Sequence, residues 1–129
     1  MSKHEYKIYT NQEFGFLKLI DVPALIDKCN EKWYNQTLCK VNDCVVRLGV
    51  FNEGEFHWHR HDKEDEFFFV VKGQLFIEFE TETVKLDLNQ GITVPKGVLH
   101  RPFVKQPTAA LMFEGDTVTP TGDGWQILY

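Results

Sequence analysis

Short stretches of apolar residues, separated by turn residues, fill the chain from residue 44 onward. Within these stretches apolar and polar positions alternate, as at Val84, Lys85, Leu86 and Asp87. A period of two residues is typical of a strand with one buried face, and the Gly, Pro and Asn residues between the stretches predict turns. The pattern predicts strands over residues 44–51, 56–61, 65–71, 74–80, 83–88, 92–94, 99–104 and 109–114.

The first forty residues carry a different pattern. Short strands are predicted over 6–10 and 14–19, on either side of a polar turn. Asp21 then predicts the N-cap of a helix, because its side chain can accept a hydrogen bond from the first turn, where Pro23 is tolerated. The helical spacing places four residues along one side of that helix, namely Leu25, Ile26, Cys29 and Trp33.

Many short strands and one short N-terminal helix predict an all-β fold, a small antiparallel barrel or sandwich. A chain of 129 residues fits one domain. We expect a strand and helix extension over 1–40, the barrel over about 41–115 and a tail over 116–129. The apolar residues expected to pack the tail are Trp125, Ile127 and Leu128.

Charge and composition argue against several kinds of partner. The 14 basic and 19 acidic residues give a net charge of −5 without a cluster of Lys or Arg, which argues against nucleic acid and anionic membrane surfaces. No apolar run approaches the roughly 18 residues that span a bilayer. The charged start predicts no secretory signal, and the three cysteines (Cys29, Cys39 and Cys44) lack CxxC spacing, which predicts reduced thiols. We therefore expect a cytoplasmic protein.

Four of the five histidines fall in two short segments, at His57, His59 and His61 and then at His100. Residues two apart on a strand share a face, so the first three histidines are predicted to point the same way. Their backbones would lie roughly 6.7 Å apart along the strand, close enough for imidazoles to converge on one ion with bonds of about 2.1 Å. The spacing alone does not decide which of these histidines bind the ion. It is also compatible with a run of polar residues on the surface that binds no metal.

Glu66 directly precedes an apolar run over 67–71. We expect it to begin the antiparallel neighbour of the histidine strand, beside the histidine pair. An unpaired carboxylate buried there would be costly, and a bound metal would remove that cost. The acidic stretch 62–66 could otherwise be a solvated turn.

Two motifs resemble those of the cupin superfamily. The first motif is His-x-His, four residues, Glu, six residues and Gly, with the positions His59, His61, Glu66 and Gly73. The second is Gly followed by Pro-x-Gly-x-x-His, with the positions Gly91, Pro95, Gly97 and His100. The match departs from the usual pattern at Gly54, which stands four residues before the first histidine, and at Val104, where an Asn is usual.

The resemblance implies a double-stranded β-helix, the jelly-roll barrel of cupins, with His59, His61, Glu66 and His100 as metal ligands. The Gly after six residues selects this register, because a pair His57 and His59 with Glu64 would place Val71 there. His57 then lies beside the site, where its ring could transfer a proton if it faces the pocket. The wider chain is similar to small single-domain cupins, many labelled as hypothetical or as similar to mannose-6-phosphate isomerase.

Three imidazoles and one carboxylate suit Fe, Mn, Ni, Co or Zn better than Ca or Mg. Such a set leaves one or two open positions on an octahedral ion and a charge of about +1, which favours an anionic substrate. Arg47 and Arg101 could clamp such an anion, or lie solvated on the surface. The sequence therefore favours a small-molecule metalloenzyme, isomerase- or dioxygenase-like, over a non-catalytic metabolite-binding or structural cupin.

Alternation along 66–71 predicts that Glu66 faces the barrel interior while Phe67, Phe69 and Val71 face outward. Outward apolar side chains need cover. A second sheet or the N-terminal helix could provide it. The alternative is a homodimer, which the resemblance also favours.

Overall fold

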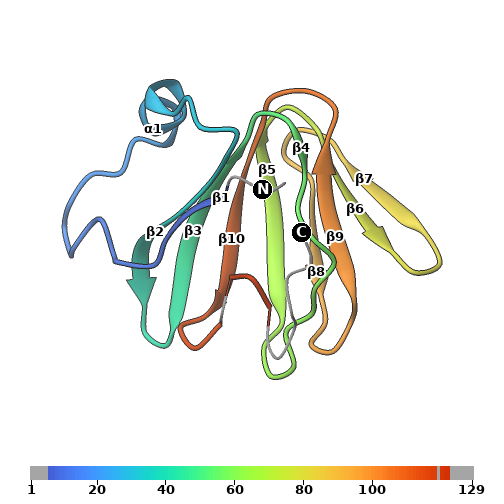
Figure 1. The fold of residues 1–129 in the computed structure, drawn as a ribbon. Coiled ribbons are helices and arrows are strands. Elements are labelled where there is room, and N and C mark those ends of the chain that lie inside the picture. Colours follow the sequence, from blue (N-terminus) through green and yellow to red (C-terminus); the bar gives the residue numbers. More distant parts are fainter. Residues whose placement is uncertain (1–5, 119, 123–129) are drawn as a thin grey trace.

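The computed structural model describes residues 6–118 and 120–122. These residues form ten strands and one short helix (Figure 1). In chain order the elements are β1 (Tyr6–Tyr9), α1 (Val22–Lys28), β2 (Trp33–Val41), β3 (Cys44–Phe51), β4 (Gly54–Glu55), β5 (Glu66–Lys72), β6 (Leu75–Phe79), β7 (Thr83–Leu86), β8 (Gly91–Val94), β9 (His100–Val104) and β10 (Thr108–Gly115).

The strands lie in two sheets. A six-stranded sheet has the order β1-β2-β3-β10-β5-β8, and a four-stranded sheet has the order β4-β9-β6-β7. Every pairing is antiparallel except that of β1 with β2, which is parallel. From β3 onward the chain passes repeatedly from one sheet to the other, so the two sheets enclose a common interior (Figure 1). The predicted all-β jelly roll is confirmed.

The alternation predicted along β5 is confirmed. Glu66, Phe68 and Val70 are buried in the interior, while Phe67 and Phe69 are only partly buried on the outer face. Since a strand turns successive side chains to opposite faces, this register sends the one charged residue of the strand's buried face into the barrel.

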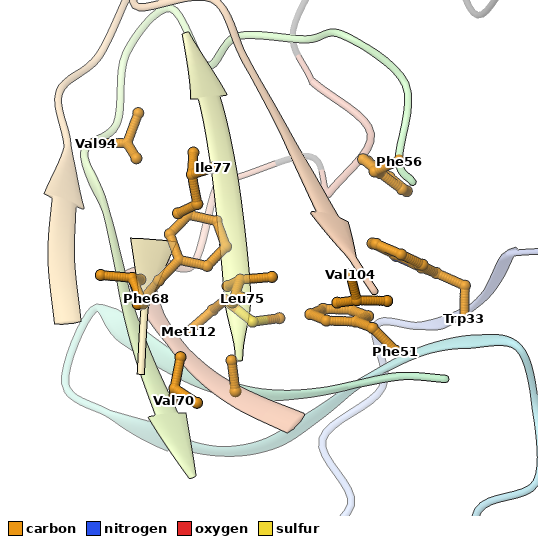
Figure 2. Close-up of a cluster of buried hydrophobic side chains, with 12 residues drawn as sticks. Trp33, Phe51, Phe56, Phe68, Val70, Leu75, Ile77, Val94, Val104 and Met112 are labelled. Carbon is orange, nitrogen blue, oxygen red and sulfur yellow. The ribbon is translucent and has the colours of Figure 1, made fainter. Parts of the chain in front are cut away.

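The interior is packed with aromatic and branched side chains from both sheets (Figure 2). Trp33 stacks on Phe51 at a ring-centroid distance of 4.2 Å and on Phe56 at 5.8 Å. Leu75 and Ile77 of the small sheet are fully buried against this cluster. The aromatic cluster borders the histidines, because the Phe56 ring meets His59 edge-on at 5.1 Å.

A second apolar layer lies on the outer face of the six-stranded sheet, under α1. Ile26 of the helix packs in one cluster with Leu48, Val50 and Ala109 of β3 and β10. The predicted N-cap is confirmed, because the Asp21 carboxylate accepts a hydrogen bond from the Ala24 amide at 3.1 Å. Within the described ranges no helix is long and apolar enough to cross a membrane.

Two predictions for the N-terminal part are wrong. Residues 14–19 form no strand: the Phe14 amide bonds to the Leu38 carbonyl, and the chain then turns at Leu17, whose φ is +64°. Trp33 is not on the helix, which ends at Lys28; it begins β2 and is buried in the barrel interior. Strand β2 is not evident from the sequence because polar residues within it hide the alternation.

Residues 56–61 are also less regular than predicted. They make one isolated bridge, from His59 to His100, instead of a continuous strand. The side chains of His57, His59 and His61 are nevertheless all buried, so the period of two persists without a full ladder. The residues predicted to pack the tail, Trp125, Ile127 and Leu128, lie outside the described residues.

Candidate metal centre

Four polar side chains meet in the barrel interior. One ligand atom from each of His59, His61, Glu66 and His100 lies within 4.8 Å of the others. All four residues are buried, and His100 has no exposed surface. These are the four residues that the two sequence motifs indicate, and we call them the histidine–glutamate group.

Both sheets contribute to this group. His59 and His100 exchange backbone hydrogen bonds of 3.0 and 2.9 Å, and the Gly97 amide donates to the His61 carbonyl at 2.7 Å, which holds the three histidines beside β9. Glu66 begins β5 in the six-stranded sheet, between β10 and β8. The expectation that Glu66 lies on a strand neighbouring the histidines is wrong. The link 62–65 carries the chain to the opposite sheet instead of forming a hairpin, so the carboxylate faces the imidazoles across the barrel.

Backbone carbonyls fix which nitrogens face the centre. The His59 Nδ1–H donates to the carbonyl of His57 at 3.0 Å, and the His100 Nδ1–H donates to that of Val98 at 2.9 Å. In the neutral imidazole, Nε2 then carries the lone pair and faces the centre, which is the form that binds a metal.

The inward-facing atoms have no hydrogen-bond partner. Glu66 Oε1 lies 3.4 Å from His61 Nε2 and 3.7 Å from His100 Nε2, and all three atoms are buried without a hydrogen bond among the described residues. Buried polar atoms left in this state are costly. A divalent ion between them would satisfy all three, so the residues present fit a metal.

Burial and neighbouring charges set the protonation states. The pKa of His59 is lowered from 6.5 to about 3, first by burial and then by the neighbouring His100, while Glu66 opposes the shift. Burial raises the pKa of Glu66, but the facing His100 and His61 outweigh it and hold that pKa below its usual range. A neutral imidazole and an ionised carboxylate are the forms that bind metals.

A second buried carboxyl group, that of Glu114, lies beside Glu66 on the neighbouring strand. Glu114 of β10 is its direct partner across the β5–β10 ladder. The Arg47 Nε–H donates to Glu114 Oε1 at 2.7 Å, and the Arg47 Nη1–H donates to Thr37 Oγ1 at 2.6 Å. Burial and the charge of Glu66 raise the pKa of Glu114 well above its usual range, against the opposing effect of Arg47.

The two arginines suggested as anion clamps do not face the group. Arg47 is 3% exposed and bound to Glu114 and Thr37. Arg101 donates to Glu78 at 2.7 Å and lies 5.2 Å from the ring centre of Trp58, on the outside of the small sheet. Glu114 was not singled out from the sequence, since its place opposite Glu66 depends on a pairing of distant strands.

His57 lies beside the group and not in it. Its Nε2 contacts the Thr121 carbonyl at 2.8 Å, and its ring packs on Phe56 at 4.4 Å. The His57 and His59 rings are 5.5 Å apart. Its predicted role in proton transfer stays a prediction.

A narrow cavity reaches the histidine–glutamate group. Its volume is about 20 Å³, which is about the space of one water molecule. Most of its lining residues are apolar, and Asn35 supplies a buried Oδ1 without a hydrogen-bond partner among the described residues. The lining residues are Trp33, Asn35, Phe51, Phe56, His59, Glu66, Phe68, Pro102, Met112 and Pro120.

Comparison with known families and proteins agrees with this geometry. Residues 48–114 match the family model described as a cupin domain. The uncharacterized protein YdbB of Bacillus subtilis (strain 168) is 41% identical over 85 residues, which cover 65% of this chain and 74% of that protein.

Solved structures share the fold. A cupin-2 domain containing protein from Shewanella frigidimarina superposes with a TM-score of 0.71 at 31% identity, covering 75% of this chain and 94% of that one. The cupin superfamily protein DSY2733 from Desulfitobacterium hafniense gives a TM-score of 0.67 at 14% identity, covering 81% and 95%. The second likeness concerns the fold alone.

The low pKa of His59 predicts a pH-dependent stability of the metal-free protein. Unfolded His59 takes up a proton near pH 6.5, whereas the folded state does so only near pH 3. Between these values the unfolded state binds more protons, so its formation is favoured as the pH falls. Urea unfolding should show His59 contributing a loss of about 1.4 kcal/mol per pH unit below pH 6.5.

The variant His59→Gln is the control for this measurement. The raised pKa of Glu114 contributes an opposite slope, but this contribution is present in both proteins and cancels in the comparison. Equal slopes in the two proteins between pH 6.5 and pH 5 would contradict the assignment.

The buried pair of Arg47 and Glu114 predicts a large asymmetry between single and double variants. Arg47→Leu should lower the free energy of unfolding by about 3–5 kcal/mol, because Glu114 loses its partner. Replacing both residues with Leu should restore most of that loss. Arg101→Leu breaks a partly exposed pair with Glu78 and should cost less than about 1 kcal/mol. A similar small loss for Arg47→Leu would show that the buried pair is unimportant.

Proposed function

Because this chain belongs to the cupin family, we propose that it binds one divalent transition metal and acts there on a small molecule. His59, His61, Glu66 and His100 are the ligands in this proposal. The observation that carries it is a set of four buried ligand atoms within 4.8 Å of one another, of which His61 Nε2, His100 Nε2 and Glu66 Oε1 have no hydrogen-bond partner among the described residues. Without a bound cation, burying these polar atoms in an apolar interior would be costly.

The donor set supports Fe, Mn, Ni, Co or Zn as the metal. When bound, such an ion supplies Lewis-acid chemistry to a substrate oxygen, which suits an isomerase- or dioxygenase-like reaction. Two features of the chain prepare the site for the ion. The Nδ1–H bonds of His59 and His100 orient their rings. The Arg47–Glu114 pair lies beside Glu66 in the β5–β10 ladder.

An anionic substrate is the proposed class. Three neutral imidazoles and one carboxylate leave a charge of about +1 with a divalent ion. Since Arg47 and Arg101 are engaged with Glu114 and Glu78, the attraction would come from the centre itself and not from an arginine clamp. Two kinds of substrate carry the required negative charge. One is a small carboxylate, and the other is a sugar phosphate, the substrate class of a mannose-6-phosphate isomerase-like protein.

A metal-binding protein without catalysis is the second candidate. The observation that favours it is the cavity volume of about 20 Å³, which admits little more than a water molecule beside the group. In that case the ion would be structural, or it would hold a metabolite after the cavity widens.

Further features of the proposal rest on the sequence. We place the protein in the cytoplasm, as one domain over 1–129, and we propose a homodimer, supported by the outward Phe67 and Phe69 of β5. His57 is proposed to hold or transfer a proton beside the metal, supported by its ring lying 5.5 Å from that of His59.

Replacing a ligand should remove the metal without removing the fold. His100→Ala should weaken metal binding at least about 100-fold, because a lost imidazole takes a direct bond with it, while far-ultraviolet circular dichroism stays unchanged. Metal content is measured by mass spectrometry on protein purified without a His tag. His57→Ala is the matched control and should keep its metal. A folded His100→Ala variant with full metal content would refute the ligand assignment.

An exogenous ligand distinguishes the two candidate functions. The cobalt(II) form should change its visible absorption spectrum when azide is added, because three imidazoles and one carboxylate leave an open position for a substrate. A spectrum that azide and small carboxylates leave unchanged would support the structural role instead.

A further inference from the structure

Among the residues that the structure describes, the three most exposed large apolar side chains project from one short segment. Phe16 is 88% exposed, Leu17 104% and Leu19 88%. We call residues 15–19 the arm. Soluble monomers do not usually hold several large apolar side chains in water at one place, so the arm calls for a partner.

The arm is held in place from both sides. On one side the amides of Glu13 and Phe14 bond to the carbonyls of Thr37 and Leu38 in β2. On the other side Ile20 packs into the apolar layer under α1. The exposed side chains are therefore presented by a segment whose flanks are fixed, and binding them costs little ordering of the chain.

An apolar surface on the same sheet has no cover from the residues that the structure describes. Phe113 of β10 pairs with Val46 of β3 and with Phe67 of β5, and the Phe67 ring lies 5.8 Å from that of Phe113 and 6.4 Å from that of Phe69. None of these four residues joins either apolar cluster of the described chain, and Phe113 is 39% exposed. We call Val46, Phe67, Phe69 and Phe113 the aromatic patch.

The arm and the aromatic patch lie on one side of the molecule. Phe14 and Ile20, which flank the arm, pack on the outer face of the six-stranded sheet together with Leu111. Phe69, next to Leu111 in the β5–β10 ladder, belongs to the patch on that same outer face. A two-fold axis through this face would bring each arm of a pair toward the patch of the other copy.

We propose that the arm of one copy of this chain docks on the aromatic patch of a second copy, reciprocally, in a two-fold symmetric dimer. This inference builds on the homodimer of the proposed function and names its interface. An aromatic side chain buries about 150–250 Å². Because the side chains of the patch are already partly buried, two arms and two patches together bury on the order of 1,200 Å², the lower end of the range for stable specific interfaces.

A second copy is the occupant that the observations favour. The arm carries projecting apolar side chains, and the patch is an apolar surface that can receive them. Two copies of the same chain therefore supply both sides of the contact. A heterologous partner would need both an arm-binding groove and a patch-binding face. The closed reciprocal arrangement also leaves neither surface free for further association.

Cross-linking between two different variants tests the interface. In a background with Cys29, Cys39 and Cys44 replaced by Ser, one preparation carries Phe16→Cys and another carries Phe113→Cys. The two are mixed, allowed to exchange subunits and treated with a short bis-maleimide. The proposal predicts a cross-linked dimer in the mixture and little from either variant alone. A mixture that exchanges subunits but yields no more cross-linking than the separate variants would overturn it.

Dissociation of the dimer provides a second measurement. The variant Phe16→Ser/Leu19→Ser should raise the dimer dissociation constant at least about 100-fold in sedimentation equilibrium, because each dimer loses both side chains twice. Leu88→Ser is the matched control, since Leu88 is 54% exposed and belongs to neither the arm nor the patch; it should leave the constant unchanged. An unchanged constant for the double variant would contradict the proposal, as would a parent protein that is monomeric at micromolar concentration.

Metal content separates this inference from the proposed metal site. The arm and the patch lie outside the barrel interior, so the Phe16→Ser/Leu19→Ser variant should bind metal as the parent does. A dimer that forms through another surface overturns the arm contact alone. Loss of metal in His100→Ala with an intact dimer supports both assignments.

Discussion

The burial of the histidine–glutamate group is the condition that the rest of the structure must satisfy. A carboxylate and imidazole nitrogens that find no hydrogen-bond partner within residues 6–118 and 120–122 are costly inside an apolar barrel unless a cation joins them. The histidines are held beside β9 in one sheet and Glu66 enters from β5 in the other. A bound ion would therefore connect the two sheets directly, and metal binding would add to the stability of the barrel.

The interior is divided between an apolar and a polar part, and this division prepares the site. The aromatic cluster around Trp33 fills one part and ends at Phe56, whose ring meets His59 edge-on. Beside Glu66 in the β5–β10 ladder lies Glu114, whose carboxyl group is held by Arg47. Donors whose orientation is set by surrounding contacts lose little freedom when they bind an ion.

Local patterns were sufficient for much of this architecture. The period of two along β5 assigned the inner and outer faces correctly, and motif spacing indicated the four residues that the fold brings together. Local patterns do not predict which strands distant in the sequence pair with each other. The position of Glu114 opposite Glu66 depends on the β5–β10 register, and the sheet that receives Glu66 depends on the path of the link 62–65. Apolar composition alone was misleading at 14–19, where Phe16, Leu17 and Leu19 face solvent.

Anomalous diffraction from crystals of the metal-loaded protein is the direct test of whether the histidine–glutamate group binds a metal ion. Data collected on both sides of the absorption edge of the bound metal locate that ion independently of any assumption about its ligands. We expect one strong peak inside the barrel, about 2.1 Å from the Nε2 atoms of His59, His61 and His100 and bonded to the carboxylate of Glu66. A peak at another site, or none in crystals loaded with Mn, Fe, Co, Ni or Zn, would contradict it.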